Sequence, residues 1–247
     1  MVHAEPVMGT VVSFHLHDDD RSDDELSSVV ERACVRLHQL DAMFSTWQRD
    51  SPISLLRAGL IGDDCLPDEV CEVLELCREA RRLSRGWFDP WSMPGGVDPT
   101  GLVKGWAVEQ ALAVLRRADV GAAVVNGGGD VAMHGEPPGG GGWRVGIQHP
   151  WRPGALACVI EAKHTVATSG CYERGAHLVN PRDGRRPTTT ASATVVGSSL
   201  ALADALATAT AVAGDEALEL IRPLEGYEAY LIRADGSEEA TSGMVFV

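Results

Sequence analysis

The stretch SSLALADALATATAVAG, residues 198–214, decides the layering of this chain. Its leucines, alanines and valine occupy every side of a helix, so we expect a helix at about 199–213 that is buried between other layers. Runs of strand-forming residues lie before and after it, and several follow one another directly. The sequence therefore predicts a single α+β domain over residues 1–247, in which sheets are packed by helices.

Hydrophobic periodicity sets the other expected elements. Residues 86–102 hold four glycines and three prolines beside two tryptophans and a phenylalanine, which is typical of an ordered functional loop. We expect helices at 25–44, 67–84, 104–117 and 199–213, with a short one ending near 222, and strands at 7–17, 121–129, 131–134, 143–148, 155–168, 190–197, 227–233 and 241–247.

The charge balance restricts the partners of this chain. Its 21 basic and 35 acidic residues give a net charge of −14, which repels nucleic acid and anionic membrane surfaces. No apolar run reaches the roughly 18 residues of a membrane span, and the sequence shows no signal peptide or lipid-attachment cysteine, so we expect a cytoplasmic protein. The six cysteines include no CxxC pair, and we expect reduced, mostly buried thiols.

Asp204 is the most informative polar residue, because an unpaired carboxylate is very costly inside an apolar helix. Thr208 lies four residues later, on the same helical face, so its hydroxyl and the carboxylate can point together at one hard cation. The alternative is that Asp204 caps a turn or pairs with an arginine.

A second candidate site is VDPTGLVKG, residues 97–105, at a loop that enters a helix. Asp98, Gly101 and Lys104 stand where free amides and the helix dipole favour an anion, and the lysine can hold a phosphate. A solvated lysine after a turn is the alternative. The spacing matches neither a Walker loop nor a GxGxxG fingerprint.

Two further motifs are rich in glycine or hydroxyl groups. NGGGD at 126–130 lets the backbone approach a ligand or form a hairpin turn. Thr168, Ser169 and Gly170 can form a nest for phosphate oxygens, and His177 is a candidate general base. The sequence has neither the GxSxG nor the HExxH signature, which argues against serine hydrolases and zinc proteases.

Taken in order, these motifs resemble the FAD:protein FMN transferase family, also called the ApbE-like flavin transferases. The resemblance covers residues 8 to 208 and rests on seven segments: MGT at 8–10, FSTW at 44–47, GWFDP at 86–90, VDPTGLVKGWAVE at 97–109, NGGGD at 126–130, TSGCYERGAHLVNPRDG at 168–184 and DALAT at 204–208.

The resemblance implies a T-fold-like domain that binds FAD, with Mg²⁺ held on the pyrophosphate by Asp204, Thr208 and the carbonyl of Gly101. It implies catalytic roles for His177 and Asp204. Asn180, Asp183, Cys171 and Glu109 depart from the usual family residues. The FAD-binding residues that it implies are Met8, Ser45, Trp47, Asp98, Lys104, Gly128, Gly129, Asp130, Thr168, Ser169, Gly170 and His177.

The expected activity is therefore magnesium-dependent transfer of FMN from FAD to a serine or threonine hydroxyl of an acceptor protein, with release of AMP. Two alternatives remain at this point. Water can replace the acceptor hydroxyl, which makes the chain an FAD pyrophosphatase, or the chain can bind FAD without catalysis.

Overall fold

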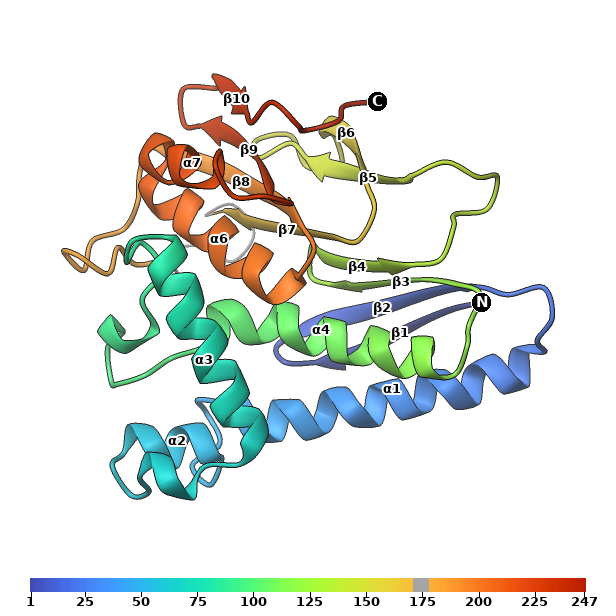
Figure 1. The fold of residues 1–247 in the computed structure, drawn as a ribbon, viewed down its shortest axis with the longest axis horizontal. Coiled ribbons are helices and arrows are strands. Elements are labelled where there is room, and N and C mark those ends of the chain that lie inside the picture. The colour runs from blue at the N-terminus through green and yellow to red at the C-terminus, as the bar shows by residue number, and fades with distance from the viewer. Residues whose placement is uncertain (171–177) are drawn as a thin grey trace.

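The computed structural model describes residues 1–170 and 178–247 and is built on one long antiparallel sheet. Within these residues eight strands pair in the order β1-β2-β3-β4-β7-β8-β9-β10, with every neighbouring pair antiparallel (Figure 1). Their bounds are β1 Val2–Val7, β2 Thr10–His17, β3 Ala122–Gly127, β4 Asp130–His134, β7 Thr165–Gly170, β8 Thr190–Gly197, β9 Glu228–Arg233 and β10 Glu238–Ala240.

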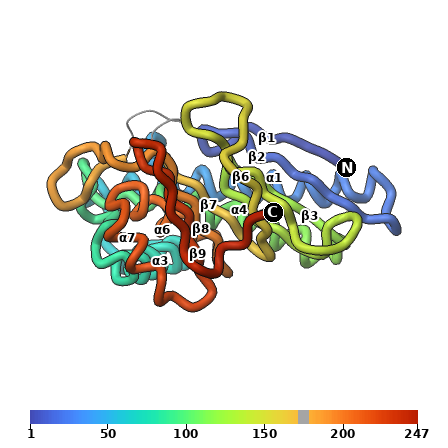
Figure 2. The backbone as a smooth tube through the Cα atoms, turned by 90° about the horizontal axis from the view of Figure 1, so that it is seen from above, coloured from blue at the N-terminus to red at the C-terminus, as the bar shows by residue number. Residues whose placement is uncertain are grey.

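Long helices cover one face of this sheet and enclose the main core (Figures 1 and 2). α6 packs against β7, β8 and α4, and its side chains are buried along almost its whole length, as the apolar sequence predicts. The helices are α1 Asp23–Phe44, α2 Pro52–Arg57, α3 Asp68–Leu83, α4 Thr100–Arg117, α6 Leu200–Ala213 and α7 Asp215–Ile221, with 3-10 turns at Asp63–Cys65 and Pro90–Ser92.

A second, smaller core lies on the other face of the sheet. Strand residues alternate between the two cores: Val131 and Met133 of β4 pack into the second, whereas Ala132 between them packs under the helices. The hairpin of β5 Trp143–Gln148 and β6 Leu156–Ala162 covers this second core. The α+β arrangement expected from the sequence is therefore confirmed.

The main differences from the expected elements come from turns. The strand expected at 7–17 begins later, as β2 at Thr10, and β1 before it was not expected. Met8 and Gly9, with positive φ values of 54° and 67°, form the two-residue hairpin turn between them. A turn after β6 divides the strand expected at 155–168. Helix α4 starts at Thr100 rather than at 104. The prediction of a strand at 241–247 is wrong, and helix α2 was not expected from the sequence.

Other expectations concern the cysteines and the membrane. The five cysteines in the described part of the chain are free thiols. Only Cys34 and Cys77 of these five are buried, so the prediction of mostly buried thiols is not confirmed. Within residues 1–170 and 178–247, no helix combines the length and apolar character that crossing a bilayer requires.

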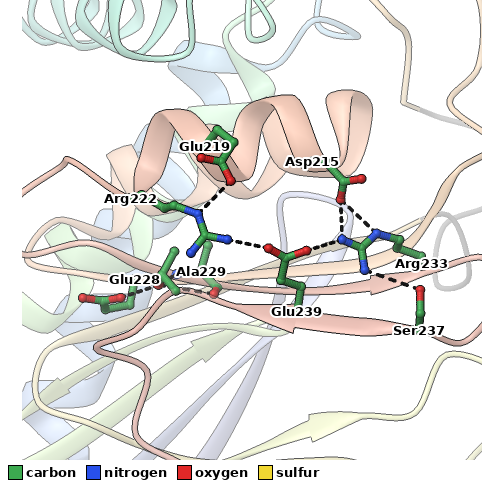
Figure 3. Close-up of polar contacts among 9 residues, drawn as sticks. Asp215, Glu219, Arg222, Glu228, Ala229, Arg233, Ser237 and Glu239 are labelled. Carbon is green, nitrogen blue, oxygen red and sulfur yellow. Dashed lines mark hydrogen bonds and ion pairs between the residues drawn. The ribbon is translucent and has the colours of Figure 1, made fainter.

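Ion pairs on the surface fasten α7 to the last strands (Figure 3). Arg233 Nη2 lies 2.6 Å from Asp215 Oδ1 and also contacts Glu239. Arg222 contacts Glu239 as well, and its Nε lies 2.8 Å from Glu219 Oε1. These groups are partly or largely exposed, so each pair adds little stability, and the network links α7 to Arg233 of β9 and Glu239 of β10.

Helix α4 approaches α6 closely at Gly105. A β-carbon placed there would lie 2.5 Å from the carbonyl oxygen of Leu200 and 3.0 Å from Cβ of Asp204. The absent side chain therefore sets how deeply Asp204 and its neighbours sit against α4.

We expect Gly105→Ala to destabilise the protein by about 2–3 kcal/mol, because the added methyl group must push the two helices apart. Alanine would otherwise favour a helix by about 1 kcal/mol, so the sign of the change reports the steric conflict. Urea unfolding measures it, and Arg117→Ala at an exposed position of α4 should change stability by less than about 0.5 kcal/mol. Equal stability of Gly105→Ala and wild type would contradict the close packing.

Candidate functional site

A hollow beside the α4–α6 contact brings together residues from four motifs that are far apart in sequence. The loop before α4, the β3–β4 turn, the end of β7 and the middle of α6 all contribute to it. The expected site residues that line it are Asp98, Gly101, Lys104, Gly128, Thr168, Ser169, Gly170, Asp204 and Thr208.

Asp204 points from α6 toward the first turns of α4. Its side chain is 3% exposed, its Oδ2 accepts a hydrogen bond of 3.1 Å from the amide of Gly105, and the Nζ of Lys104 lies 3.6 Å away. The cationic partner that the sequence demands therefore includes a lysine rather than the arginine considered as the alternative. The carboxylate lines the hollow at the same time.

Lys104 also joins α4 to the sheet. Its ammonium group contacts the carboxylate of Asp130, whose side chain is fully buried at the start of β4. The other carboxylate oxygen of Asp130 accepts a 3.1 Å hydrogen bond from the amide of Thr168 on β7. One ammonium group thus faces two buried carboxylates, and its position is set by both layers of the fold.

The hydroxyl-bearing residues Thr168, Ser169 and Thr208 also line the hollow. Ser169 Oγ lies 3.2 Å from Thr208 Oγ1, and Thr168 Oγ1 lies 2.9 Å from Thr194 Oγ1. A β-carbon at Gly101 would stand 3.7 Å from Thr208 Oγ1 and 3.2 Å from the Phe88 ring, so a side chain there would fill the space beside Thr208.

These oxygen atoms fit a hard divalent cation. Asp204 and Thr208 lie one turn apart on α6, and Gly101 faces Thr208 from the first turn of α4. Carboxylate, hydroxyl and carbonyl oxygens are the donors that Mg²⁺ accepts in proteins. A side chain at Gly101 would narrow the space beside Thr208.

Glu109 has a role that the sequence analysis did not identify. Its carboxylate accepts hydrogen bonds from the amides of Leu200 at 2.6 Å and Ala201 at 3.2 Å, which are free donors at the start of α6. Burial raises the pKa of Glu109, although these hydrogen bonds oppose the effect. Glu109 lies one turn after Gly105 on α4, so both residues face α6, and only the tertiary contact at Gly105 reveals this.

Asp98 holds the start of α4. Its Oδ1 accepts hydrogen bonds from the amide of Thr100 at 3.1 Å and from its hydroxyl at 2.6 Å, and its Oδ2 lies 3.4 Å from Arg57 Nη1. The aspartate therefore stabilises the entry of the loop into the helix while its surface lines the hollow.

Two adjoining hollows hold Met8, Ser45, Trp47 and Gly129, whereas Asp130, also expected at the site, lines none of the three hollows. Met8, Ser45 and Trp47 line one that shares Thr100 and Lys104 with the first. Trp47 is 93% exposed, so its ring is free to cover a flat ligand.

The other adjoining hollow lies against the second sheet face and shares Gly128 and Thr168 with the first. Gly128 and Gly129, with φ values of 63° and 95°, form the β3–β4 hairpin turn, so NGGGD makes a turn and borders both hollows.

The loop at 86–99 closes one side of the first hollow. Trp87 and Phe88 line it, and the guanidinium carbon of Arg182 lies 3.5 Å from the centre of the Trp87 ring. The buried Nε1 of Trp87 finds no hydrogen-bond partner among the residues that the structure describes. His177 and Cys171 fall outside those residues, so their places relative to the hollow stay sequence-based predictions.

Comparison with known proteins supports the same family on three grounds. Residues 8–95 and 91–231 match the model of the ApbE family. A Rhodobacter capsulatus protein named FAD:protein FMN transferase is 36% identical over 161 residues, which cover 60% of this chain and 30% of that protein. A Vibrio cholerae protein of the same name is 29% identical over 131 residues, covering 49% and 39%. The chain thus spans less than half of either relative.

Solved structures share the fold over almost the whole chain. The flavin transferase ApbE from Vibrio cholerae superimposes with a TM-score of 0.83 at 19% identity, covering 98% of this chain and 97% of that one. Pseudomonas stutzeri flavinyl transferase ApbE in its apo form gives 0.83 at 23% identity, covering 98% and 94%. With the family model matched over most of its length, this chain belongs to the ApbE family.

Proposed function

We propose that this chain transfers FMN from FAD to a serine or threonine hydroxyl of an acceptor protein and releases AMP. The observation that supports this most is the meeting of Lys104, Ser169, Asp204 and Thr208 in one hollow, where a pyrophosphate and a hard cation can be held together. The names of the two relatives agree with this activity.

The three adjoining hollows suit an extended dinucleotide. The pyrophosphate would lie in the first, between the ammonium group of Lys104 and the hydroxyl groups of Thr168 and Ser169. The two flat ring systems of FAD would reach toward Trp47 in one direction and toward the β3–β4 turn in the other.

Mg²⁺ would be held by Asp204, Thr208 and the carbonyl of Gly101, where it would supply charge neutralisation to the pyrophosphate. Asp130 would orient Lys104, because both of its oxygens are already used within the protein. Glu109 would fix the start of α6 and, through it, the depth of Asp204.

In the reaction the acceptor hydroxyl oxygen would form a bond to the FMN-side phosphorus, and the bond from that phosphorus to the bridging oxygen would break, so AMP leaves. We assign removal of the hydroxyl proton to His177 on sequence grounds. Trp87 and Phe88, which line the hollow, would keep water from competing with the acceptor.

A test of this function compares FAD turnover with and without an acceptor. The protein is incubated with FAD and Mg²⁺, alone or with peptides that expose a serine or threonine, and AMP release and peptide mass are followed. We expect at least about tenfold faster AMP release with a productive peptide, because the screened site disfavours water. The peptide should gain FMN, and its alanine counterpart should gain nothing.

Two outcomes would contradict transfer. Rapid AMP release without any acceptor, with no peptide or protein ever gaining FMN, would identify an FAD pyrophosphatase. Tight FAD binding that needs no Mg²⁺ and never yields AMP would identify a non-catalytic FAD-binding protein.

A further inference from the structure

A group of metal-binding side chains lies away from the proposed flavin site, between the edge strand β1 and helix α1. His3 and Glu5 of β1 and Cys34 of α1 each offer a ligand atom, and these atoms all lie within 4.8 Å of one another. Each comes from a different kind of donor: imidazole nitrogen, carboxylate oxygen and thiol sulfur. None of them lines the hollows described above.

Local structure explains why these side chains meet. His3 and Glu5 are two residues apart on a strand, so they share a face, and that face carries Val7 into the core under α1. Cys34 lies on the buried side of α1, which packs against β1. The neighbouring strands place Phe14 opposite His3, with ring centres 6.1 Å apart, which limits the movement of the imidazole.

A fourth residue orients the carboxylate. His38 follows Cys34 by one helical turn, and its Nε2 lies 2.7 Å from Glu5 Oε1, while His3 Nε2 lies 3.4 Å from Glu5 Oε2. The contact with His38 fixes one carboxylate oxygen of Glu5 and leaves the other directed toward His3. A ligating carboxylate that is hydrogen-bonded on its other oxygen is common in protein metal sites.

The donor set selects the kind of ion. Mg²⁺ and Ca²⁺ prefer oxygen ligands, whereas one nitrogen, one sulfur and one oxygen suit Zn²⁺, whose ligand atoms stand about 3–4 Å apart in a tetrahedron. The three ligand atoms, which lie within 4.8 Å of one another, are close to that spacing.

We propose that His3, Glu5 and Cys34 form a Zn²⁺ site that fastens the edge strand β1 to α1, with His38 orienting Glu5 and water as the fourth ligand. His3 and Glu5 are partly exposed, which gives the ion a path from solvent. Zn²⁺ binds the thiolate form of a cysteine, so binding would release the proton of the Cys34 thiol to solvent.

The test uses the untagged, reduced, metal-free full chain and Co²⁺ as a spectroscopic substitute for Zn²⁺. We expect one equivalent of Co²⁺ to produce a thiolate-to-metal charge-transfer band, which Zn²⁺ abolishes and millimolar Mg²⁺ does not. Zn²⁺ alone should raise the melting temperature by about 5 °C or more, since an ion that binds only the folded state stabilises it.

Matched variants locate the site. Cys34→Ala should remove the band, and His3→Ala and Glu5→Gln should each weaken Co²⁺ binding at least about tenfold. His15→Ala, on the exposed face of β2, and Cys71→Ala, an exposed thiol on α3, should change nothing. Cys171→Ala controls for the cysteine outside the described residues.

The proposal is overturned if wild type gives no thiolate band. It is also overturned if the band survives Cys34→Ala, or if His3→Ala binds Co²⁺ as wild type does. His3 is partly exposed, so its variant should fold even if Cys34→Ala does not.

Discussion

Asp204→Ala should slow FMN transfer by about 10²–10³-fold, the size of effect seen when one group that stabilises charge at a reacting centre is removed. The carboxylate lines the hollow and is held by the Gly105 amide and by Lys104, so it is fixed before any ligand arrives. Its loss would leave the proposed cation with a hydroxyl and a carbonyl as protein ligands. AMP release measured across a Mg²⁺ titration checks this.

Asp204→Asn separates charge from shape, because its amide oxygen can still accept the hydrogen bond from Gly105. We expect Asp204→Asn to be nearly as inactive as Asp204→Ala. Asp215→Ala, which removes a surface carboxylate of α7 that pairs with Arg233, should be fully active. Melting temperatures of the two Asp204 variants should stay within a few degrees of wild type, since Lys104 keeps Asp130 as a partner. Undiminished activity of Asp204→Ala in excess chelator would exclude the proposed role.

The buried helix was predictable because its pattern leaves no polar face. A helix that is apolar on all sides has to lie between layers, and the lone carboxylate in it has to meet a cation or a donor. Both expectations hold for α6 and Asp204, and Lys104, which the sequence placed in a separate motif, is one of the partners. Motif order along the chain could not show that these two motifs face each other.

The turns and the supporting contacts were harder to predict. The Met8–Gly9 turn requires a positive φ at a methionine, which sequence patterns rarely indicate. Glu109 serves α6 only because Gly105 lets the two helices approach, so its role depends on tertiary packing. The cluster of His3, Glu5 and Cys34 needs a strand and a helix to meet, and no local spacing of metal ligands marks it.

Lys104→Met should destabilise the protein by about 3–5 kcal/mol, the range typical of breaking a buried ion pair by removing one partner. Asp130 is fully buried and Asp204 nearly so, and the variant would leave both carboxylates without the ammonium group between them. Urea unfolding gives the loss directly. Lys163→Met, at the exposed second lysine of the chain, should leave stability within about 0.5 kcal/mol of wild type.

The pH dependence of Lys104→Met tests whether charge is the cause. A buried carboxylate without a cation favours its neutral form, so the folded variant takes up a proton more readily than the unfolded chain. The loss of unfolding free energy relative to wild type should therefore shrink as pH falls from 8 to 5. Asp130→Asn in the Lys104→Met background should recover about half or more of the loss, because asparagine can still accept from the Thr168 amide without carrying charge. A deficit that is the same at every pH and is not relieved by Asp130→Asn would mean that packing of the lysine stem, rather than its charge, holds α4 against the sheet.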